Sequence, residues 1–278
     1  MLCFPNCKIN LGLYVTRKRE DGYHDIETVF YPVVPAVATD FGLYDVLEIV
    51  PADVASLHLS GLAVAGNNES NLVWKAYRLL QQHFPGIVPE LSIFLHKVIP
   101  MGAGLGGGSA NGAFMLRLLN DYCKLGLSDT GLAGFALQLG SDCPFFIYNT
   151  PQFAIGRGEQ MTAAELDLSA YSIQLICPQV HVSTSTAFQM IKPQSAPFDL
   201  RLLHTLPVDK WRGTISNDFE APVFQQHPVL AQIKEQLYDQ GAIYASMSGS
   251  GSAIYGIFAR SQRARITANV PFEVFYIP

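Results

Sequence analysis

Residues 100–111 read Pro100-Met101-Gly102-Ala103-Gly104-Leu105-Gly106-Gly107-Gly108-Ser109-Ala110-Asn111, with five glycines in seven positions. Apolar alternation predicts a strand over 91–96 before this run, and apolar spacing predicts a helix over 113–122 after it. Glycine permits positive φ and close approach of a ligand to the backbone, and a helix N-terminus favours an anion. The order strand, glycine loop, helix therefore favours phosphate binding by residues 100–110 over a turn that needs glycine only for its geometry.

Three better-known nucleotide motifs fit this stretch less well. Residues 102–107 spell Gly-x-Gly-x-x-Gly, but the dinucleotide fingerprint should open an early βαβ unit with an acid after the next strand, whereas Asp121 falls within the expected helix. Walker A requires a lysine where Gly108 stands. The Asp-Phe-Gly tripeptide at 40–42 precedes the glycine loop, and the sequence contains no His-Arg-Asp, so we interpret it as a chance match to protein kinases.

Composition indicates a globular protein of one large or two ordinary domains. The chain has 278 residues, of which 49% are hydrophobic, and no apolar run long enough to span a bilayer. A formal net charge of −5 argues against a general nucleic-acid surface. The five cysteines form no Cys-x-x-Cys pair, and the first residues lack a signal-peptide pattern. We therefore expect free thiols and a cytoplasmic protein with neither a membrane nor a nucleic acid as partner.

Strands and helices are mixed without regular βαβα alternation, which indicates the α+β class. The boundary between two domains is predicted near residues 150–160. Predicted strands cover 7–15, 26–34, 46–50, 56–59, 91–96, 145–148, 171–177, 243–247, 253–258 and 272–277; predicted helices cover 71–84, 113–122, 128–140, 183–190, 218–224 and 228–240.

Several polar and aromatic residues stand at positions where chemistry is possible. Lys8 and Asn10 share the polar face of the strand 7–15, although an ordinary surface lysine on a half-solvated strand has the same pattern. Asp142 lies between a helix end and an apolar stretch, where it is either a turn acid or a partner of a cation. Tyr23 and His24 follow a turn and suit either a flat ring ligand or an ordinary turn.

The glycine loop, an N-terminal lysine strand and a late small-residue turn resemble the GHMP kinase superfamily. Within it, further segments resemble the kinases that act on a cytidine diphosphate-linked sugar alcohol in non-mevalonate isoprenoid precursor biosynthesis. The resemblance runs from Lys8 to about Phe258. The segments that carry it are Lys8-Ile9-Asn10-Leu11, Asp21-Gly22-Tyr23-His24, Gly140-Ser141-Asp142-Cys143-Pro144-Phe145-Phe146, Gly156-Arg157-Gly158-Glu159, Asn217-Asp218-Phe219-Glu220 and Met247-Ser248-Gly249-Ser250-Gly251-Ser252.

The resemblance implies a two-domain fold and an ATP-dependent reaction. It implies an N-terminal ATP-binding domain over 1–152, like ribosomal protein S5 domain 2, and a ferredoxin-like C-terminal domain over 153–278. ATP would lie on the central loop, where Ala110 stands in place of a frequent second serine and leaves Ser109 the more important hydroxyl. Lys8 and Asp142 would be catalytic. Asp142 would take the proton of the acceptor hydroxyl, and Lys8 would keep Asp142 charged and orient the hydroxyl.

Substrate binding is expected, by the same resemblance, at five residues. They are Asn10, Tyr23, His24, Phe30 and Phe188. Mg²⁺ is assumed from ATP chemistry, without a named metal ligand. The alternatives are another GHMP-type kinase of the mevalonate or homoserine kind, a dinucleotide-binding oxidoreductase, and a non-catalytic nucleotide-binding protein.

Overall fold

The chain forms two compact units whose segments alternate along the sequence. The computed structural model describes residues 1–34, 43–64, 66–260 and 262–278, so the Asp-Phe-Gly tripeptide of 40–42 lies outside the described residues. Unit 1 consists of Met1–Cys7, Leu43–Met101 and Gly106–Thr150, and unit 2 of Lys8–Gly42, Gly102–Leu105 and Pro151–Pro278. The division into domains 1–152 and 153–278 stays a prediction.

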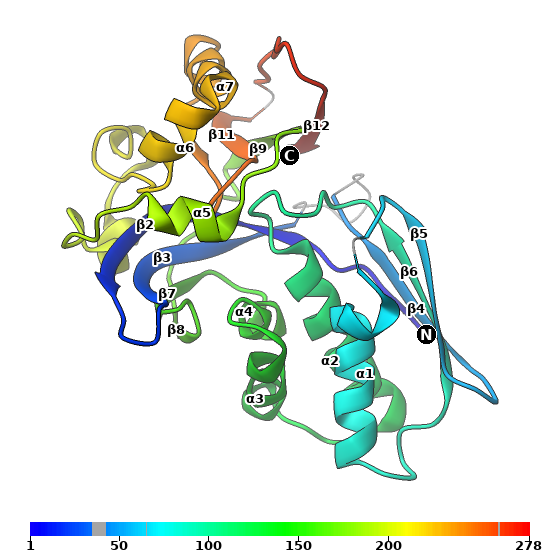
Figure 1. Ribbon diagram of the computed structural model, residues 1–278. Coiled ribbons are helices and arrows are strands. Elements are labelled where there is room, and N and C mark those ends of the chain that lie inside the picture. Colours follow the sequence, from blue (N-terminus) through cyan, green and yellow to red (C-terminus); the bar gives the residue numbers. More distant parts are fainter. Residues whose placement is uncertain (35–42, 65, 261) are drawn as a thin grey trace. The chain divides into compact units, whose positions relative to one another are not determined.

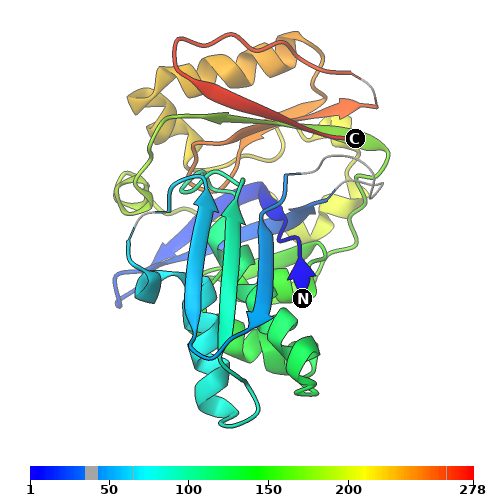
Figure 2. The same cartoon turned by 90° about the vertical axis from the view of Figure 1, so that its right-hand side faces the viewer.

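Unit 1 is a four-stranded sheet with helices on one face (Figure 1). Its strand order is β1-β4-β6-β5, with β5 parallel to β6 and the other neighbours antiparallel. Figure 2 shows this sheet in front of its helices. The strands alternate between buried and exposed residues because only one face is covered. Their bounds are β1 Leu2–Cys3, β4 Val46–Pro51, β5 Ser56–Gly61 and β6 Leu91–Lys97.

The helices of unit 1 lie where apolar spacing predicts them, except that one of them replaces a predicted strand. They are η1 Asn68–Ser70, α1 Leu72–His83, α2 Gly107–Cys123, α3 Asp129–Leu139 and α4 Cys143–Tyr148. The prediction of a strand over 145–148 is wrong, because these residues belong to α4. A short apolar run does not distinguish a strand from a helix that is buried all round, and Pro144 in the first turn favours the helix.

Unit 2 contains two antiparallel sheets. The first has the order β2-β3-β7-β8 and the second β10-β11-β9-β12. The first comprises β2 Cys7–Lys18, β3 His24–Val33, β7 Gln152–Gly156 and β8 Gln160–Ala163; the second comprises β9 Tyr171–Pro178, β10 Tyr244–Met247, β11 Ile254–Ala259 and β12 Phe272–Ile277. The predicted last strand is confirmed, since β12 pairs with β9 along its length.

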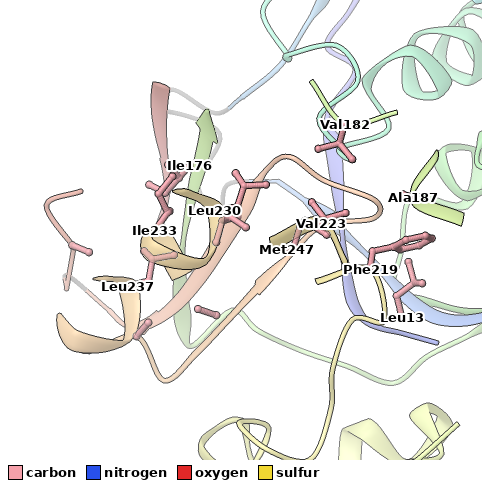
Figure 3. Close-up of a cluster of buried hydrophobic side chains, with 14 of the residues drawn as sticks. Leu13, Ile176, Val182, Ala187, Phe219, Val223, Leu230, Ile233, Leu237 and Met247 are labelled. Atoms are coloured by element: carbon pink, nitrogen blue, oxygen red, sulfur yellow. The ribbon is translucent and has the colours of Figure 1, made fainter. Parts of the chain in front are cut away.

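A hydrophobic cluster joins the second sheet of unit 2 to its helices (Figure 3). Leu230, Ile233 and Leu237 form one stripe of α7 and are fully buried against β10 and β11. Leu13 of β2 belongs to the same cluster. The helices of this unit are α5 Thr184–Gln189, η2 Leu200–Thr205, η3 Val208–Lys210, α6 Glu220–Gln226 and α7 Pro228–Asp239.

The structure corrects two expectations: the exposure of the strand over 7–15 and the start of the helix after the glycine run. The half-solvated strand that alternation allowed over 7–15 is wrong, because β2 is buried on both faces from Cys7 to Val15. Helix α2 begins at Gly107, six residues before the predicted Ala113. Glycine lowers helix propensity, so tertiary packing and not local preference forms this first turn. The α+β class is confirmed. Within the described residues, no helix has the length and hydropathy of a membrane span.

Candidate active site

The glycine run joins β6 to α2, as the sequence predicts, and its backbone is left-handed at three glycines. Gly102, Gly104 and Gly106 have φ angles of 69°, 77° and 71°, a region that residues with a Cβ rarely adopt. Gly106 is the N-cap of α2 and no side chain caps this helix. Its first-turn amides, together with the helix dipole, favour an anionic group. The loop therefore has the geometry of a phosphate site.

A second small-residue segment, residues 248–252, packs on the glycine loop within unit 2. Ser248 Oγ donates to the carbonyl oxygen of Gly104 at 2.8 Å. Asn217, which is only 4% exposed, supports the segment, because its Nδ2 donates to the carbonyl oxygens of Met247 and Gly249 at 2.8 Å each. Residues 248–252 thus brace the glycine loop and are more than an isolated turn. Sequence analysis assigned no role to Asn217, although this residue lies in one of the segments that resemble the GHMP kinases.

We expect Gly104→Ala to destabilise the protein much more than Gly102→Ala. Both positions have positive φ, so each alanine costs about 1–2 kcal/mol of backbone strain. A Cβ at Gly104 would also overlap the carbonyl oxygen of Ser248, whereas a Cβ at Gly102 would meet no described atom within 4 Å. Thermal unfolding and the Kd for an ATP analogue check this. Equal losses in the two variants would contradict the bracing by residue 248.

Lys8, Asn10 and Phe30 are brought together in unit 2. Lys8 and Asn10 are 4% and 2% exposed, and Lys8 Nζ donates to Asn10 Oδ1 at 2.6 Å. Asn10 Nδ2 donates in turn to Thr28 Oγ1 at 3.0 Å. The ammonium also lies 4.9 Å from the centroid of the Phe30 ring, whose residue is 2% exposed. The interpretation of Lys8 as an ordinary surface lysine is therefore wrong, because its side chain is buried and its ammonium is hydrogen-bonded to Asn10.

The predicted aromatic residues gather at the β2–β3 turn and α5, also in unit 2. His24 and Phe188 stack directly, with ring centroids 4.9 Å apart and an interplanar angle of 17°. Tyr23 is 58% exposed, and the Arg157 guanidinium lies 5.1 Å from the centroid of its ring. Burial lowers the pKa of His24, and the Lys18 cation adds to this shift. The imidazole is therefore neutral at pH 7, with one donor and one acceptor nitrogen.

Asp142 occupies the N-cap position of α4 in unit 1. Its side chain makes no capping hydrogen bond, which argues against a simple helix cap. The next residue, Cys143, is fully buried; burial raises the pKa of its thiol to about 12, and a hydrogen bond with Ser109 opposes the rise. The segment of Asp142 thus adjoins the first turn of α2. Lys8 belongs to unit 2, so its pairing with Asp142 stays a prediction.

A buried ionic cluster next to the glycine loop in unit 1 was missed by sequence reasoning. Asp45, Lys97 and Asn111 are 0%, 1% and 3% exposed. Lys97 and Asp45 form a salt bridge. One signal could have revealed the cluster, because Lys97 continues the inward register of the alternating strand β6, where an apolar residue is normal.

Comparison with known proteins identifies the family. The model of the GHMP kinases N terminal domain matches residues 71–150, and that of the GHMP kinases C terminal domain matches residues 208–276. The chain belongs to the GHMP kinase family. This confirms the predicted family, the two-domain GHMP kinase fold and the class of ATP-dependent small-molecule kinase.

Two similar proteins from Bacteroides species have the same name. A Bacteroides fragilis protein called 4-diphosphocytidyl-2-C-methyl-D-erythritol kinase is 48% identical over 267 residues, which are 95% of this chain and 94% of the relative. A Bacteroides thetaiotaomicron protein of the same name is 50% identical over 262 residues, covering 93% of this chain and 92% of the relative.

Solved structures have the same fold. The crystal structure of a 4-(cytidine 5'-diphospho)-2C-methyl-D-erythritol kinase superposes with a TM-score of 0.75 at 30% identity, covering 92% of this chain and 90% of the other. Homoserine kinase from Cytophaga hutchinsonii superposes with a TM-score of 0.73 at 17% identity, covering 100% and 93% of the two chains. At that identity, the second match indicates the fold alone.

Proposed function

We propose that this GHMP kinase transfers the γ-phosphoryl group of ATP to the 2-hydroxyl of 4-diphosphocytidyl-2-C-methyl-D-erythritol, in non-mevalonate isoprenoid precursor biosynthesis. The observation that carries the proposal is the near-50% identity, over more than nine tenths of the chain, to proteins with that name. None of the five cysteines is paired in a disulfide, which is consistent with work in the cytoplasm, where thiols stay reduced. The expected partners are two small molecules, ATP and the cytidyl substrate.

ATP would place its phosphates on residues 100–110. The left-handed glycines allow the backbone to approach the phosphates, and the N-terminus of α2 supplies amides and the positive end of a helix dipole. Ser109, on the first turn, would add a hydroxyl donor. These groups would bind and orient the triphosphate, and positioning supplies a large part of catalysis in phosphoryl transfer.

Mg²⁺ would enter with ATP. Among the described residues, no three His, Cys, Asp or Glu side chains gather as a metal site. Mg²⁺ does not require such a cluster, because it commonly binds through one or two carboxylates together with substrate phosphates and water. The ion would neutralise charge on the phosphates of bound ATP, and we assign no residue of this chain as its ligand.

The acceptor hydroxyl would be served by Lys8 and Asp142. Asp142 would accept the hydroxyl proton as general base. Lys8 would orient the hydroxyl and offset negative charge near it, with its ammonium held by Asn10. Asn10 would in addition bind polar groups of the sugar alcohol. The carboxylate is expected to be a modest base, so most of the rate enhancement would come from positioning and charge neutralisation.

The cytidine base would be recognised by the aromatic residues of unit 2. Neutral His24 offers a donor and an acceptor for the edge of the base, and hydrogen bonds discriminate bases where stacking does not. A base between His24 and Phe188 requires a centroid spacing of about 7 Å, twice the usual contact distance, whereas the rings are 4.9 Å apart. Substrate binding would therefore part these two rings. Tyr23 would cover the base from the outside, and Phe30 would act mainly through its contact with Lys8.

The proposed reaction is tested by ATP consumption with three acceptors. We expect turnover with 4-diphosphocytidyl-2-C-methyl-D-erythritol and none above background with mevalonate or homoserine. Homoserine is the important control, because a homoserine kinase superposes nearly as well as the cytidyl enzyme. Phosphorylation of homoserine or mevalonate, without the cytidyl substrate, would refute the proposed acceptor and retain the GHMP kinase fold.

A further inference from the structure

Asp45 links the two ends of the glycine loop inside unit 1. Its Oδ1 accepts the backbone N–H groups of Val98 at 2.7 Å and Ile99 at 2.9 Å, the last residues before the loop. Its Oδ2 accepts Asn111 Nδ2 at 2.7 Å, in the first turns of α2 after the loop. One carboxylate thus ties the strand that enters the loop to the helix that leaves it.

Lys97 completes the cluster and contacts the start of α2. Its ammonium pairs with Asp45 and donates to Asn111 Oδ1 at 2.9 Å. A Cβ at Gly107 would lie 3.3 Å from Lys97 Nζ and 2.8 Å from Ile99 Cγ2, so the first residue of α2 packs directly on the cluster. Burial lowers the pKa of Lys97, and the Asp45 carboxylate opposes this shift.

The charges of this cluster have a consequence for an anion at the helix N-terminus. An unpaired carboxylate at Asp45 would repel the phosphates of a nucleotide bound at the start of α2. Lys97 offsets that charge, so Asp45 can accept two backbone N–H groups and the Asn111 amide without opposing a phosphate. A buried pair of this kind often contributes little to stability, but it fixes geometry through its hydrogen bonds.

We propose that the Asp45–Lys97–Asn111 cluster is a positioning device for the triphosphate of ATP. It sets the separation of the loop ends and the direction of the α2 amides, and it touches no substrate itself. The inference rests on the proposed function only in that ATP phosphates bind on the glycine loop; it is independent of the acceptor.

The test compares affinity for the triphosphate with affinity for the nucleoside. Asn111→Asp keeps the shape of the side chain, removes its donor and adds a second carboxylate; Asn111→Ala removes both hydrogen bonds. Calorimetry would measure the Kd of a non-hydrolysable ATP analogue and of adenosine. We expect the Kd of the analogue to rise roughly tenfold for the alanine variant and further for the aspartate variant, the effect of losing charge-assisted hydrogen bonds. The Kd of adenosine should change by no more than about twofold.

Leu80→Ala is the matched control for lost stability. Leu80 is fully buried in α1 of the same unit, and its apolar side chain makes no hydrogen bond to the cluster. We expect it to lower the Tm at least as much as Asn111→Ala while leaving the Kd of the ATP analogue unchanged. A folded Asn111 variant whose Kd values for both ligands match those of the wild type would overturn the proposal. So would parallel weakening of the analogue and adenosine.

The result separates this inference from the proposed function. Wild-type protein that binds the ATP analogue but phosphorylates no cytidyl substrate would refute the acceptor, and the Asn111 comparison would still decide the role of the cluster. Wild-type protein that binds adenosine and the analogue equally well would overturn the positioning of phosphates. Asn111 is chosen as the site of substitution because it is the uncharged member, so the Asp45–Lys97 pair keeps both charges.

Discussion

Asp142→Asn is expected to lower kcat by roughly 10²–10⁴-fold, the usual contribution of a general base. Asparagine has nearly the same shape, and Asp142 makes no side-chain capping hydrogen bond to α4, so this helix should form as before. The amide cannot take the hydroxyl proton. The Kd for ATP should stay within about twofold, because the phosphates are proposed to bind to backbone amides of the loop. Steady-state kinetics and calorimetry on the same preparation check both values.

Asp129→Asn provides the matched control. Asp129 is the exposed first residue of α3, so the same substitution is made at the start of a neighbouring helix in the same unit. We expect it to leave kcat unchanged. A non-catalytic nucleotide-binding protein would behave identically with either substitution. If Asp142→Asn weakened ATP binding in proportion to the loss of turnover, the residue would belong to the nucleotide site and not to the acceptor.

The parts of the fold that were predictable depend on short-range patterns. The apolar spacing of 228–240 and the glycine at its end predict α7, which runs from Pro228 to Asp239. The glycine run predicts a loop between a strand and a helix, because the backbone freedom of glycine is a local property that can be read from the sequence. The start of α2 at Gly107 was not predictable in the same way. Gly107 packs closely on Ile99 and Lys97, and helix propensity takes no account of such tertiary contacts.

In the candidate site, too, contacts between residues far apart in the sequence could not be derived from local patterns. His24 and Phe188 are 164 positions apart by their residue numbers and meet only through the fold of unit 2. Their association was inferred from resemblance, because no periodicity links them. Asp45 and its hydrogen-bond partners lie 52 to 66 residues apart in the sequence. A single aspartate before a strand has no local feature that identifies its partners, so the buried register of Lys97 in β6 was the local signal for this cluster.

Lys8→Met is expected to lower kcat by roughly 10²–10³-fold, the range typical of losing one preorganised charge that stabilises the transition state. The same change should keep or raise the Tm. Methionine fills the space of the lysine stem and can pack on the Phe30 ring, which lies 4.9 Å from the ammonium. It also removes the desolvation cost of a buried cation, which offsets the loss of the hydrogen bond to the buried Asn10 Oδ1. A structural lysine would give a lower Tm together with lower activity, so opposite changes in the two quantities indicate a catalytic role.

Asn10→Ala separates the charge of Lys8 from its orientation. It removes the 2.6 Å acceptor of the ammonium and the donor to Thr28, but leaves the cation in place. Its kcat should therefore fall less than that of Lys8→Met, while KM for the cytidyl substrate rises, because Asn10 is also proposed to bind the sugar alcohol. Equal kcat values for the two variants would mean that the orientation of the ammonium matters as much as its charge. In that case the buried amide, which β2 places two residues from Lys8, would be part of the catalytic group.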